Sequence, residues 1–294
     1  MQYIKLIRPK DWAKNLFLFL PVFFSGHIFN TDSHIQLLLG FVAFSFVASS
    51  IYIINDYRDI EDDRRHPTKK FRPLASGAVS KPASLVICTL LLVAGFLLSW
   101  YVRDKFLFVL GIYFAMNLAY SFVLKEVPIL DIMIVAAGFV LRVKAGSVIA
   151  GVAMSEWIVI MVFLLALFMA IGKRRDDVLL KVNSGVDMRK SMKGYNLDFL
   201  NVLLALVSSV IIVAYFMYTM SEDVKLRLGT YRLYYTCLFV FAGLLRYLQI
   251  IYVSGESGSP TKILYKDRFI QVSILLWVAS YVFLLYFKDY TFFE

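Results

Sequence analysis

The residues best suited to chemistry lie in one polar segment, INDYRDIEDDRRHPTKKFRPLASG, at positions 54–77. Asp56, Asp59 and Asp63 recur in it at spacings of three and four residues, and Asn55 stands directly before the first. If the segment continues a helix, one face carries all three carboxylates, with successive side chains about 5–6 Å apart. A hard divalent cation such as Mg²⁺ relieves the repulsion between carboxylates so close together. The spacing therefore predicts a magnesium site with four ligands: Asn55, Asp56, Asp59 and Asp63.

A simpler interpretation is a solvated acidic face that Arg58, Arg64 and Arg65 neutralise. The regular spacing, the leading Asn and the position at the end of a long apolar segment favour the metal site. Six basic or titratable groups follow within nine residues, at positions 64–72. Beside a metal site, such a run suits a phosphorylated substrate, because Arg and Lys bind the oxygens that the metal leaves free. Alone, the same run is more typical of a segment that binds lipid headgroups or sets membrane topology.

The rest of the chain predicts that this segment sits at a membrane surface. Of 294 residues, 60% are hydrophobic and 18% are charged, and the mean hydropathy is +0.71. Ordinary globular chains are about 45–50% apolar and about 25% charged. Apolar runs of about 20 residues recur, as in membrane-spanning helices. We expect one integral all-α membrane domain over residues 1–294, with nine spans: Trp12–Phe29, Leu37–Ile54, Ala83–Tyr101, Phe106–Leu124, Pro128–Ala150, Trp157–Ile171, Phe199–Met220, Thr236–Val253 and Ile270–Phe287.

The distribution of positive charge predicts the orientation. The net charge is +10, and 22 of the 31 Lys and Arg residues would lie on the side of the N-terminus, against 6 on the other side. By the positive-inside rule the N-terminus is cytoplasmic and, with nine spans, the C-terminus lies outside. The charge is thus explained by topology and anionic lipid, and we expect no nucleic-acid partner. The cytoplasmic loops at 55–82, 172–198 and 254–269 would cover the active site.

Some charged residues fall inside the predicted spans. Arg246 would lie about 10 Å below the cytoplasmic edge of its span, where a lipid-facing charge is costly. It is therefore a functional candidate, although its side chain could also snorkel to the interface. Asp131 and Arg142 are eleven residues apart, so they share a helix face that we expect to point into the protein. Lys144 lies nearer the outer end and is expected to snorkel.

The acidic segment resembles the first aspartate-rich motif of the UbiA superfamily of intramembrane prenyltransferases, whose members have nine transmembrane helices. Further motifs are similar to one branch of it, typified by decaprenyl-phosphate phosphoribosyltransferase. In chain order these are RPKDWAKN at 8–15, HPTKKFRPLASG at 66–77, YSFVLK at 120–125, LRVKAGS at 141–147, GKR at 172–174, LRY at 245–247 and KDRFIQ at 266–271. The resemblance implies Mg²⁺-dependent transfer of 5-phosphoribose from phosphoribosyl diphosphate (PRPP) to a polyprenyl phosphate of the decaprenyl type, on the cytoplasmic face of the cell membrane.

The resemblance also implies roles for residues outside the acidic motif. Arg65, Lys69 and Arg72 would contact the phosphates of the donor. Lys173 and Arg174 would hold either the lipid phosphate or the ribose 5-phosphate, and the sequence leaves that choice open. Asp267 and Arg268 would close over the donor or form a simple ion pair in their loop. The remaining substrate-binding candidates face the same layer or lie within spans: Lys14, Asn15, Tyr120, Lys125, Arg142 and Arg246.

One difference from the sequence pattern of the superfamily favours the phosphoribosyltransferase branch. Ordinary members carry a second aspartate-rich motif after the sixth helix, which holds a second Mg²⁺. This chain has Lys173, Arg174 and Arg175 there, followed by Asp176 and Asp177. A basic site suits a monophosphate, whereas the two aspartates also allow a degenerate metal site.

Two other functions compete with this one. A UbiA-type polyprenyltransferase would alkylate an aromatic acceptor with an isoprenyl diphosphate, but it requires the second acidic motif. A transporter would place its charges at the midplane and use paired broken helices, for which the sequence gives no sign. The sequence leaves open whether copies of the chain associate as a homo-oligomer.

Overall fold

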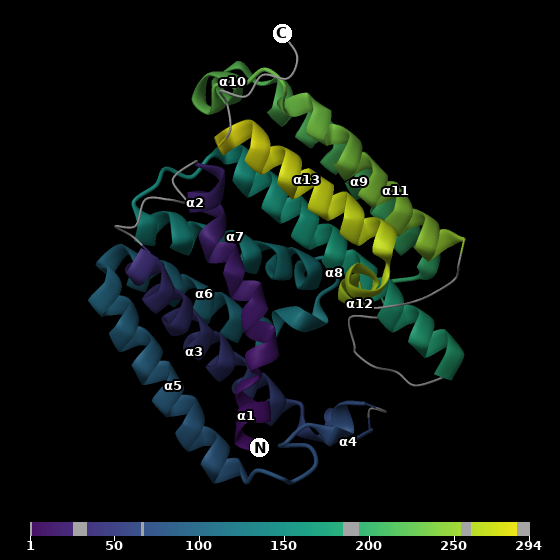
Figure 1. Ribbon diagram of the computed structural model, residues 1–294. Helices are drawn as coiled ribbons and strands as arrows, with labels where there is room; N and C mark the ends of the chain where they lie inside the picture. Colours follow the sequence, from purple (N-terminus) through teal and green to yellow (C-terminus); the bar gives the residue numbers. More distant parts are fainter. Residues whose placement is uncertain (1, 26–33, 66–67, 185–193, 254–259, 287–294) are drawn as a thin grey trace. The chain divides into compact units, whose positions relative to one another are not determined.

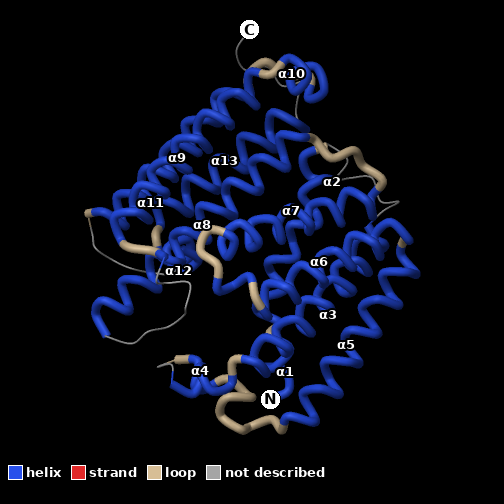
Figure 2. Tube along the Cα trace, turned by 180° about the vertical axis from the view of Figure 1, so that it is seen from behind, coloured by secondary structure: helices blue, strands red, loops and turns tan. Residues whose placement is uncertain are grey.

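The computed structural model describes residues 2–25, 34–65, 68–184, 194–253 and 260–286, and all regular structure in them is helical. Eight of these helices are long and apolar enough to cross a membrane. The chain divides into two compact units, Met1–Ser155 and Glu156–Glu294. Figures 1 and 2 show the helices of both units, and the single membrane domain expected from composition stays a prediction.

The first unit contains four of the eight candidate spans, and they agree with the predicted segments to within a few residues. Its long helices and the short elements that join them are α1 (Gln2–Ile7), η1 (Pro9–Phe19), α2 (Leu20–Phe24), α3 (His34–Arg58), α4 (Ile60–Arg65), η3 (Lys69–Phe71), α5 (Lys81–Val102), α6 (Asp104–Phe122), η4 (Leu124–Glu126) and α7 (Leu130–Ala150). Figure 1 shows α5, α3 and α6 running alongside one another.

The second unit contributes the other four candidate spans. Its elements are α8 (Glu156–Ser184), α9 (Leu197–Met220), α10 (Glu222–Leu228), η6 (Leu233–Thr236), α11 (Cys237–Tyr252), α12 (Pro260–Lys266) and α13 (Arg268–Tyr286). The segment 172–184, expected as part of a loop, is helical and extends α8. Continuous apolar residues before it and helix formers within it explain why the helix does not end at the predicted boundary.

The first predicted span, Trp12–Phe29, is not found as one long helix. The described part of it consists of the 3₁₀ helix η1 and the short α2, and residues 26–29 lie outside the described residues. Nine spans are therefore not confirmed. Pro21, near the start of α2, lacks the amide hydrogen that a continuous helix requires at that point.

Small residues allow the helices of the first unit to pack closely. A Cβ atom added to Gly95 of α5 would lie 2.7 Å from Val47 of α3, and one added to Gly146 of α7 would collide with the carbonyl oxygen of Leu18. Such close approaches are typical of helices packed in membranes. The η1 backbone therefore rests directly on α7, and this contact brings the residues of η1 to the interior of the unit.

The core of each unit is apolar, and several buried aromatic side chains contact one another or hydrogen-bond. In the first unit Phe44 and Tyr113 contact each other with ring centroids 4.5 Å apart. In the second unit the Tyr218 and Tyr281 hydroxyls are 2.5 Å apart, and the Trp277 indole donates to the Tyr215 oxygen at 2.7 Å. These hydrogen bonds stabilise the fold, because a polar group without a partner in a membrane interior costs several kcal/mol.

The contact between Gly146 and Leu18 gives a testable prediction. Because the added methyl group would collide with backbone, Gly146→Ala should destabilise the purified protein by about 1–3 kcal/mol, seen as a lower melting temperature in detergent. Gly111→Ala is the matched control, since a Cβ there meets nothing within 4 Å. Equal melting temperatures for the two variants would contradict the packing of η1 on α7.

Candidate functional site

The acidic segment forms the end of α3 and the short α4, with one bend between them. The amide of Asp59 donates to the Asn55 carbonyl at 3.0 Å, and the amide of Asp63 donates to the Asp59 carbonyl at 2.8 Å. The backbone thus keeps helical hydrogen bonds across the junction, as the spacing predicted. Asp56 is 2% exposed and Asp63 is 4% exposed, so two carboxylates are almost fully buried.

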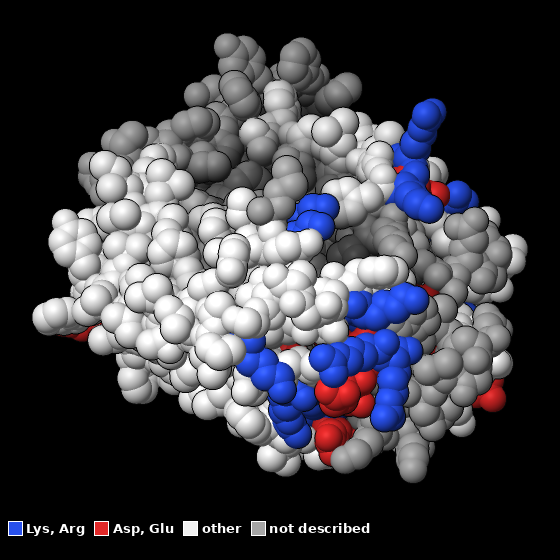
Figure 3. Space-filling view, turned by 90° about the horizontal axis from the view of Figure 1, so that it is seen from below, with Lys and Arg blue, Asp and Glu red and all other residues white. Residues whose placement is uncertain are grey.

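The buried carboxylates bind guanidinium groups. Nη1 of Arg72 donates to Asp56 at 3.0 Å and to Asp63 at 2.7 Å, so one arginine bridges the two. Nη2 of Arg8 lies 2.5 and 2.6 Å from the two carboxylate oxygens of Asp56. Figure 3 shows Lys and Arg side chains gathered around acidic side chains in one patch of the molecule.

The third acid turns to a different partner. Asp59 accepts a hydrogen bond of 2.6 Å from the ammonium group of Lys125, which lies in η4. Lys125 was predicted to face the acidic segment, and this contact brings it there. Among the residues the structure describes, no group of three or more His, Cys, Asp and Glu could hold a metal ion, so the predicted metal site is not shown here. Arg72 is shared by Asp56 and Asp63, whereas Lys125 binds Asp59.

The donor atoms nevertheless suit magnesium. The carboxylates of Asp59 and Asp63 and the amide oxygen of Asn55 are hard oxygen ligands of the kind that Mg²⁺ prefers. Asp56 differs, because both of its oxygens contact an arginine. The metal assignment stays a prediction for all four residues.

Arg8 is a site residue that the sequence-based choice of candidates missed. Its backbone has φ 55° and ψ 58°, the left-handed conformation that costs a residue with a Cβ about 1–2 kcal/mol. Its guanidinium carbon also lies 5.1 Å from the centre of the Tyr52 ring. The motif RPKDWAKN contained Arg8, but only the fold shows that it reaches the end of α3.

Asn15 and Arg142 meet in the interior of the first unit. Asn15 is 1% exposed and Arg142 is 5% exposed. Nε of Arg142 donates to the Asn15 side-chain oxygen at 2.9 Å, and Nη2 donates to the Tyr113 hydroxyl at 2.8 Å. Three aromatic rings, those of Phe44, Tyr113 and Phe139, lie 4.9–5.2 Å from the guanidinium carbon. The expectation that Arg142 and Asp131 both face inward is confirmed, because Asp131 is fully buried.

The remaining candidates of the first unit lie nearer the surface. The ammonium of Lys14 donates to Asp11 at 2.6 Å, and it also lies over the Tyr52 ring. Arg65 is exposed, and Lys69 and Tyr120 are half-buried. The proposed substrate contacts of Arg65, Lys69 and Tyr120 stay predictions.

In the second unit, the basic segment at the end of α8 is mostly buried. Arg174 is 4% exposed and donates to Asp177 at 2.9 Å, while Lys173 is exposed. Arg175, which was not among the predicted site residues, donates to Asn201 at 2.7 Å. One of the two aspartates is thus neutralised by an arginine one turn away.

Arg246 and Asp267 form an ion pair. Nε and Nη2 of Arg246 donate to Oδ2 of Asp267 at 3.1 and 2.8 Å. Oδ1 of Asp267 also accepts from the amide of Ile270 at 2.9 Å, so Asp267 caps α13. The hydrogen bond from Arg246 lowers the pKa of Asp267 below its ordinary value. The ion pair expected from sequence between Asp267 and Arg268 is not the one observed: Asp267 pairs with Arg246, and Arg268 is exposed.

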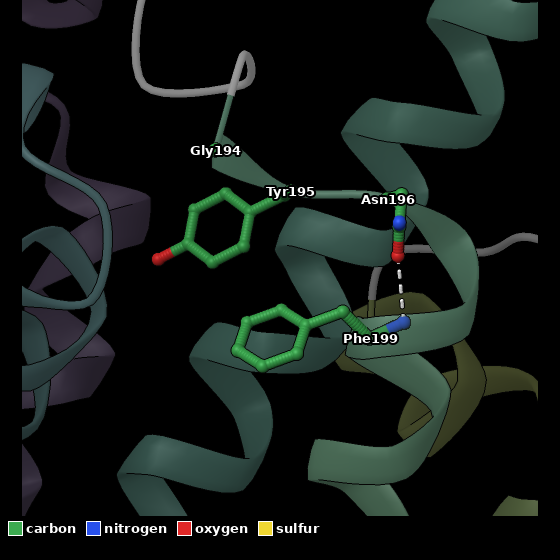
Figure 4. A pocket seen from close by; sticks show the side chains of 4 residues that line it. All are labelled: Gly194, Tyr195, Asn196 and Phe199. Carbon is green, nitrogen blue, oxygen red and sulfur yellow. Dashed lines mark hydrogen bonds between the residues drawn. The ribbon is translucent and has the colours of Figure 1, made fainter.

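A shallow pocket of about 390 Å³ lies at the start of α9. Figure 4 shows the rings of Tyr195 and Phe199 beside each other and the Asn196 side chain accepting from the Phe199 amide, at 2.7 Å. All of its lining residues are neutral, and none was predicted as a site residue.

The sequence of the chain is similar to that of known proteins. Residues 16–184 match the UbiA prenyltransferase family. A protein of Mycolicibacterium smegmatis named decaprenyl-phosphate phosphoribosyltransferase is 36% identical, over 97% of this chain and 92% of its own. A protein of Corynebacterium glutamicum with the same name is 34% identical, over 96% of this chain and 86% of its own.

The fold is similar to that of solved structures. A UbiA homolog from Archaeoglobus fulgidus bound to GPP and Mg²⁺ superposes with a TM-score of 0.73 at 22% identity, covering 97% of this chain and 99% of that one. The same homolog bound to DMAPP and Mg²⁺ gives a TM-score of 0.72.

The pair of Arg246 and Asp267 predicts a dependence of stability on pH. Because the pKa of Asp267 is lowered in the folded protein, the pair stabilises above the ordinary Asp pKa of about 3.9 and loses its effect as the pH falls through the lower value. Asp267→Asn keeps the capping oxygen and removes the charge. We expect it to lower the melting temperature at pH 7, and the difference from the parent protein to shrink progressively as the pH falls below the ordinary Asp pKa.

Asp223→Asn is the control for this experiment, because Asp223 is an exposed acid of the same unit. It should leave the melting temperature unchanged over the same pH range. A difference between Asp267→Asn and the parent that stays constant over the whole range would contradict an electrostatic role for the pair.

Proposed function

The chain belongs to the UbiA prenyltransferase family and is a transferase, and from this premise we propose that it transfers 5-phosphoribose from PRPP to a polyprenyl phosphate and releases diphosphate. The observation that carries the proposal is the agreement with two proteins named decaprenyl-phosphate phosphoribosyltransferase over almost the whole chain. Decaprenyl phosphate, or a polyprenyl phosphate like it, is therefore the proposed acceptor.

The arrangement of charges supports two anionic substrates. At one end of α3, Arg8, Arg72 and Lys125 surround the acidic segment. In the second unit, Arg174 and Arg175 lie in α8, at the position where ordinary members of the superfamily carry a second aspartate-rich motif. Arg forks bind phosphates with two parallel hydrogen bonds, which suits both the donor and a lipid monophosphate.

The reaction proposed for these residues requires no general base. A phosphate oxygen of the acceptor is already an anion, so it forms the new bond to C1 of ribose while the bond from C1 to the diphosphate oxygen breaks. The diphosphate leaves with the electron pair, and direct displacement inverts the configuration at C1. Mg²⁺, when bound, neutralises the leaving diphosphate.

The residues of the chain position the reactants. We propose that Asp59, Asp63 and Asn55 hold the metal, and that Arg72, Lys69 and Arg65 bind donor phosphates. Lys125, which donates to Asp59, would also lie within the region where the donor phosphates bind. The basic residues offset the repulsion between the two anionic substrates, and fixing both substrates in line lowers the barrier. Lys173 and Arg174 are proposed to bind the lipid phosphate or the ribose 5-phosphate.

The distribution of Lys and Arg supports a cytoplasmic active site in the cell membrane. With 22 of 31 positive residues on the side of the acidic segment, the positive-inside rule places that side in the cytoplasm. PRPP is a water-soluble donor, so it would enter from that side, whereas the acceptor lipid would enter from the bilayer.

The substrate pair can be tested directly. Purified protein in lipid nanodiscs should transfer label from ³²P-PRPP to decaprenyl phosphate in the presence of Mg²⁺, and EDTA should abolish the transfer. The alternative function predicts a product from an isoprenyl diphosphate and 4-hydroxybenzoate instead. Formation of only the second product would overturn the proposal.

The metal assignment has a separate test. Even the outer partners of metal ligands contribute about 10- to 100-fold to affinity or activity. We therefore expect Asp59→Ala and Asp63→Ala each to lower Mg²⁺-dependent transfer by at least about 100-fold. The matched control is Glu61→Ala, an exposed acid of the same segment that pairs with Arg64. If Asp59→Ala and Asp63→Ala behaved like this control, the metal would lie elsewhere.

A further inference from the structure

One face of α3 holds the N-terminal segment through four side chains. Ser45 accepts from Asn15 at 2.9 Å, and Ser49 donates to the Ile7 carbonyl at 2.7 Å while accepting from the Trp12 indole at 3.0 Å. Tyr52 lies under the Arg8 guanidinium, and Asp56 binds it. Residues 45, 49, 52 and 56 are spaced by four, three and four, so they form one helical stripe. The contacts on this stripe fix the backbone on both sides of Arg8.

The strained residue on that segment is the one that reaches the acidic cluster. Arg8 has a left-handed backbone although it carries a Cβ, and such conformations persist where the surrounding structure enforces them, often at functional sites. The strain aims the guanidinium at Asp56. Arg72 is shared between Asp56 and Asp63, so Arg8 supplies the second positive charge of this buried cluster.

Two arginines therefore bind Asp56, and both of its carboxylate oxygens accept hydrogen bonds from them. Arg8 contacts both of its oxygens, and Arg72 contacts one of them as well. At 2% exposure, this carboxylate has the least access of the three acids to an ion from solution. Its position suits an anchor for guanidinium groups better than a metal ligand.

The two arginines retain hydrogen-bond donors. In the described part of the chain, Arg8 uses only Nη2 and Arg72 uses only Nη1, out of the five N–H donors of each guanidinium. Their side chains are 20% and 26% exposed, so part of each group meets solvent. Two guanidinium groups held side by side with unused donors are suited to a diphosphate, which offers several acceptor oxygens on adjacent phosphates.

We propose that Arg8 is a second guanidinium of the donor-diphosphate site, held beside Arg72 by Asp56, and that Asp56 is a positioning residue for both arginines. This inference rests on the proposed function for the identity of the donor. It changes the role predicted for Asp56 from the spacing of the acids, and it leaves Asp59 and Asp63 as the proposed carboxylate ligands of the metal.

The test separates anion binding from metal binding in detergent-purified protein. Mn²⁺ affinity is measured by electron paramagnetic resonance, and affinity for inorganic diphosphate is measured by calorimetry without metal. We expect Arg8→Lys and Asp56→Asn to weaken diphosphate binding by about 10- to 100-fold, because each disturbs a charge-assisted fork. Both should keep Mn²⁺ affinity within about 3-fold of the parent. Asp59→Asn should show the opposite pattern.

Kinetic measurements distinguish a role in donor binding from a merely structural role of Arg8, because only the first would change KM for PRPP. Arg8→Lys should raise KM for PRPP more than it lowers kcat. Because Arg8 and Asp56 act together, the double variant should be little worse than either single one. Glu61→Gln is the control and should change neither affinity nor KM. Melting temperatures identify any variant that is misfolded, and Asp56→Glu then replaces Asp56→Asn.

Two results would overturn the inference. A loss of Mn²⁺ affinity in Asp56→Asn as large as that in Asp59→Asn would make Asp56 a metal ligand. Unchanged diphosphate affinity and KM in a folded Arg8→Lys protein would make Arg8 a structural clamp. Neither measurement with inorganic diphosphate or Mn²⁺ requires transfer, so failure of the proposed substrate pair remains distinguishable from failure of this inference.

Discussion

The neutralisation of buried carboxylates by guanidinium groups is the interaction on which the candidate site depends. Asp56 and Asp63 are almost fully buried at the end of α3, and an isolated charge there would be very costly. Arg72 bridges the two, and Arg8 completes the shell of Asp56. Removal of either arginine would leave a buried charge uncompensated. The same contacts therefore stabilise the end of the helix and bring cations to the place where an anionic donor would bind.

This constraint connects the fold to the site. Arg8 can reach Asp56 only because η1 and α1 lie along α3, and η1 can lie there only because Gly146 allows the Leu18 backbone to approach α7. The close packing at Gly146, far from the acidic segment in sequence, thereby helps to position the Arg8 guanidinium group. In the second unit the basic end of α8 is held in a similar way, through hydrogen bonds from Arg174 and Arg175.

Sequence reasoning predicted much of this, for identifiable reasons. Continuous apolar runs define eight of the spans, because length and hydropathy suffice for a helix in lipid. The helical continuation at Asp59 and the approach of Lys125 also agree with expectation. The first span is not confirmed: its described part is a 3₁₀ helix followed by a short α-helix, a geometry that apolar composition does not reveal. Arg8 and Tyr113 were missed because their partners lie 48 and 29 residues away in sequence, and only tertiary structure joins them. The pairing of Asp59 with Lys125 and of Asp56 with Arg8 could not be predicted, because spacing does not show which cation each acid contacts.

Arg142 differs from the arginines at the end of α3, because its hydrogen-bond acceptors are an amide oxygen, a peptide carbonyl and a phenol. Within the described residues these three acceptors are neutral dipoles, so they stabilise the guanidinium without cancelling its charge. Because Arg142 is 5% exposed, salt in the buffer screens this charge much less than it screens the charge of an exposed lysine.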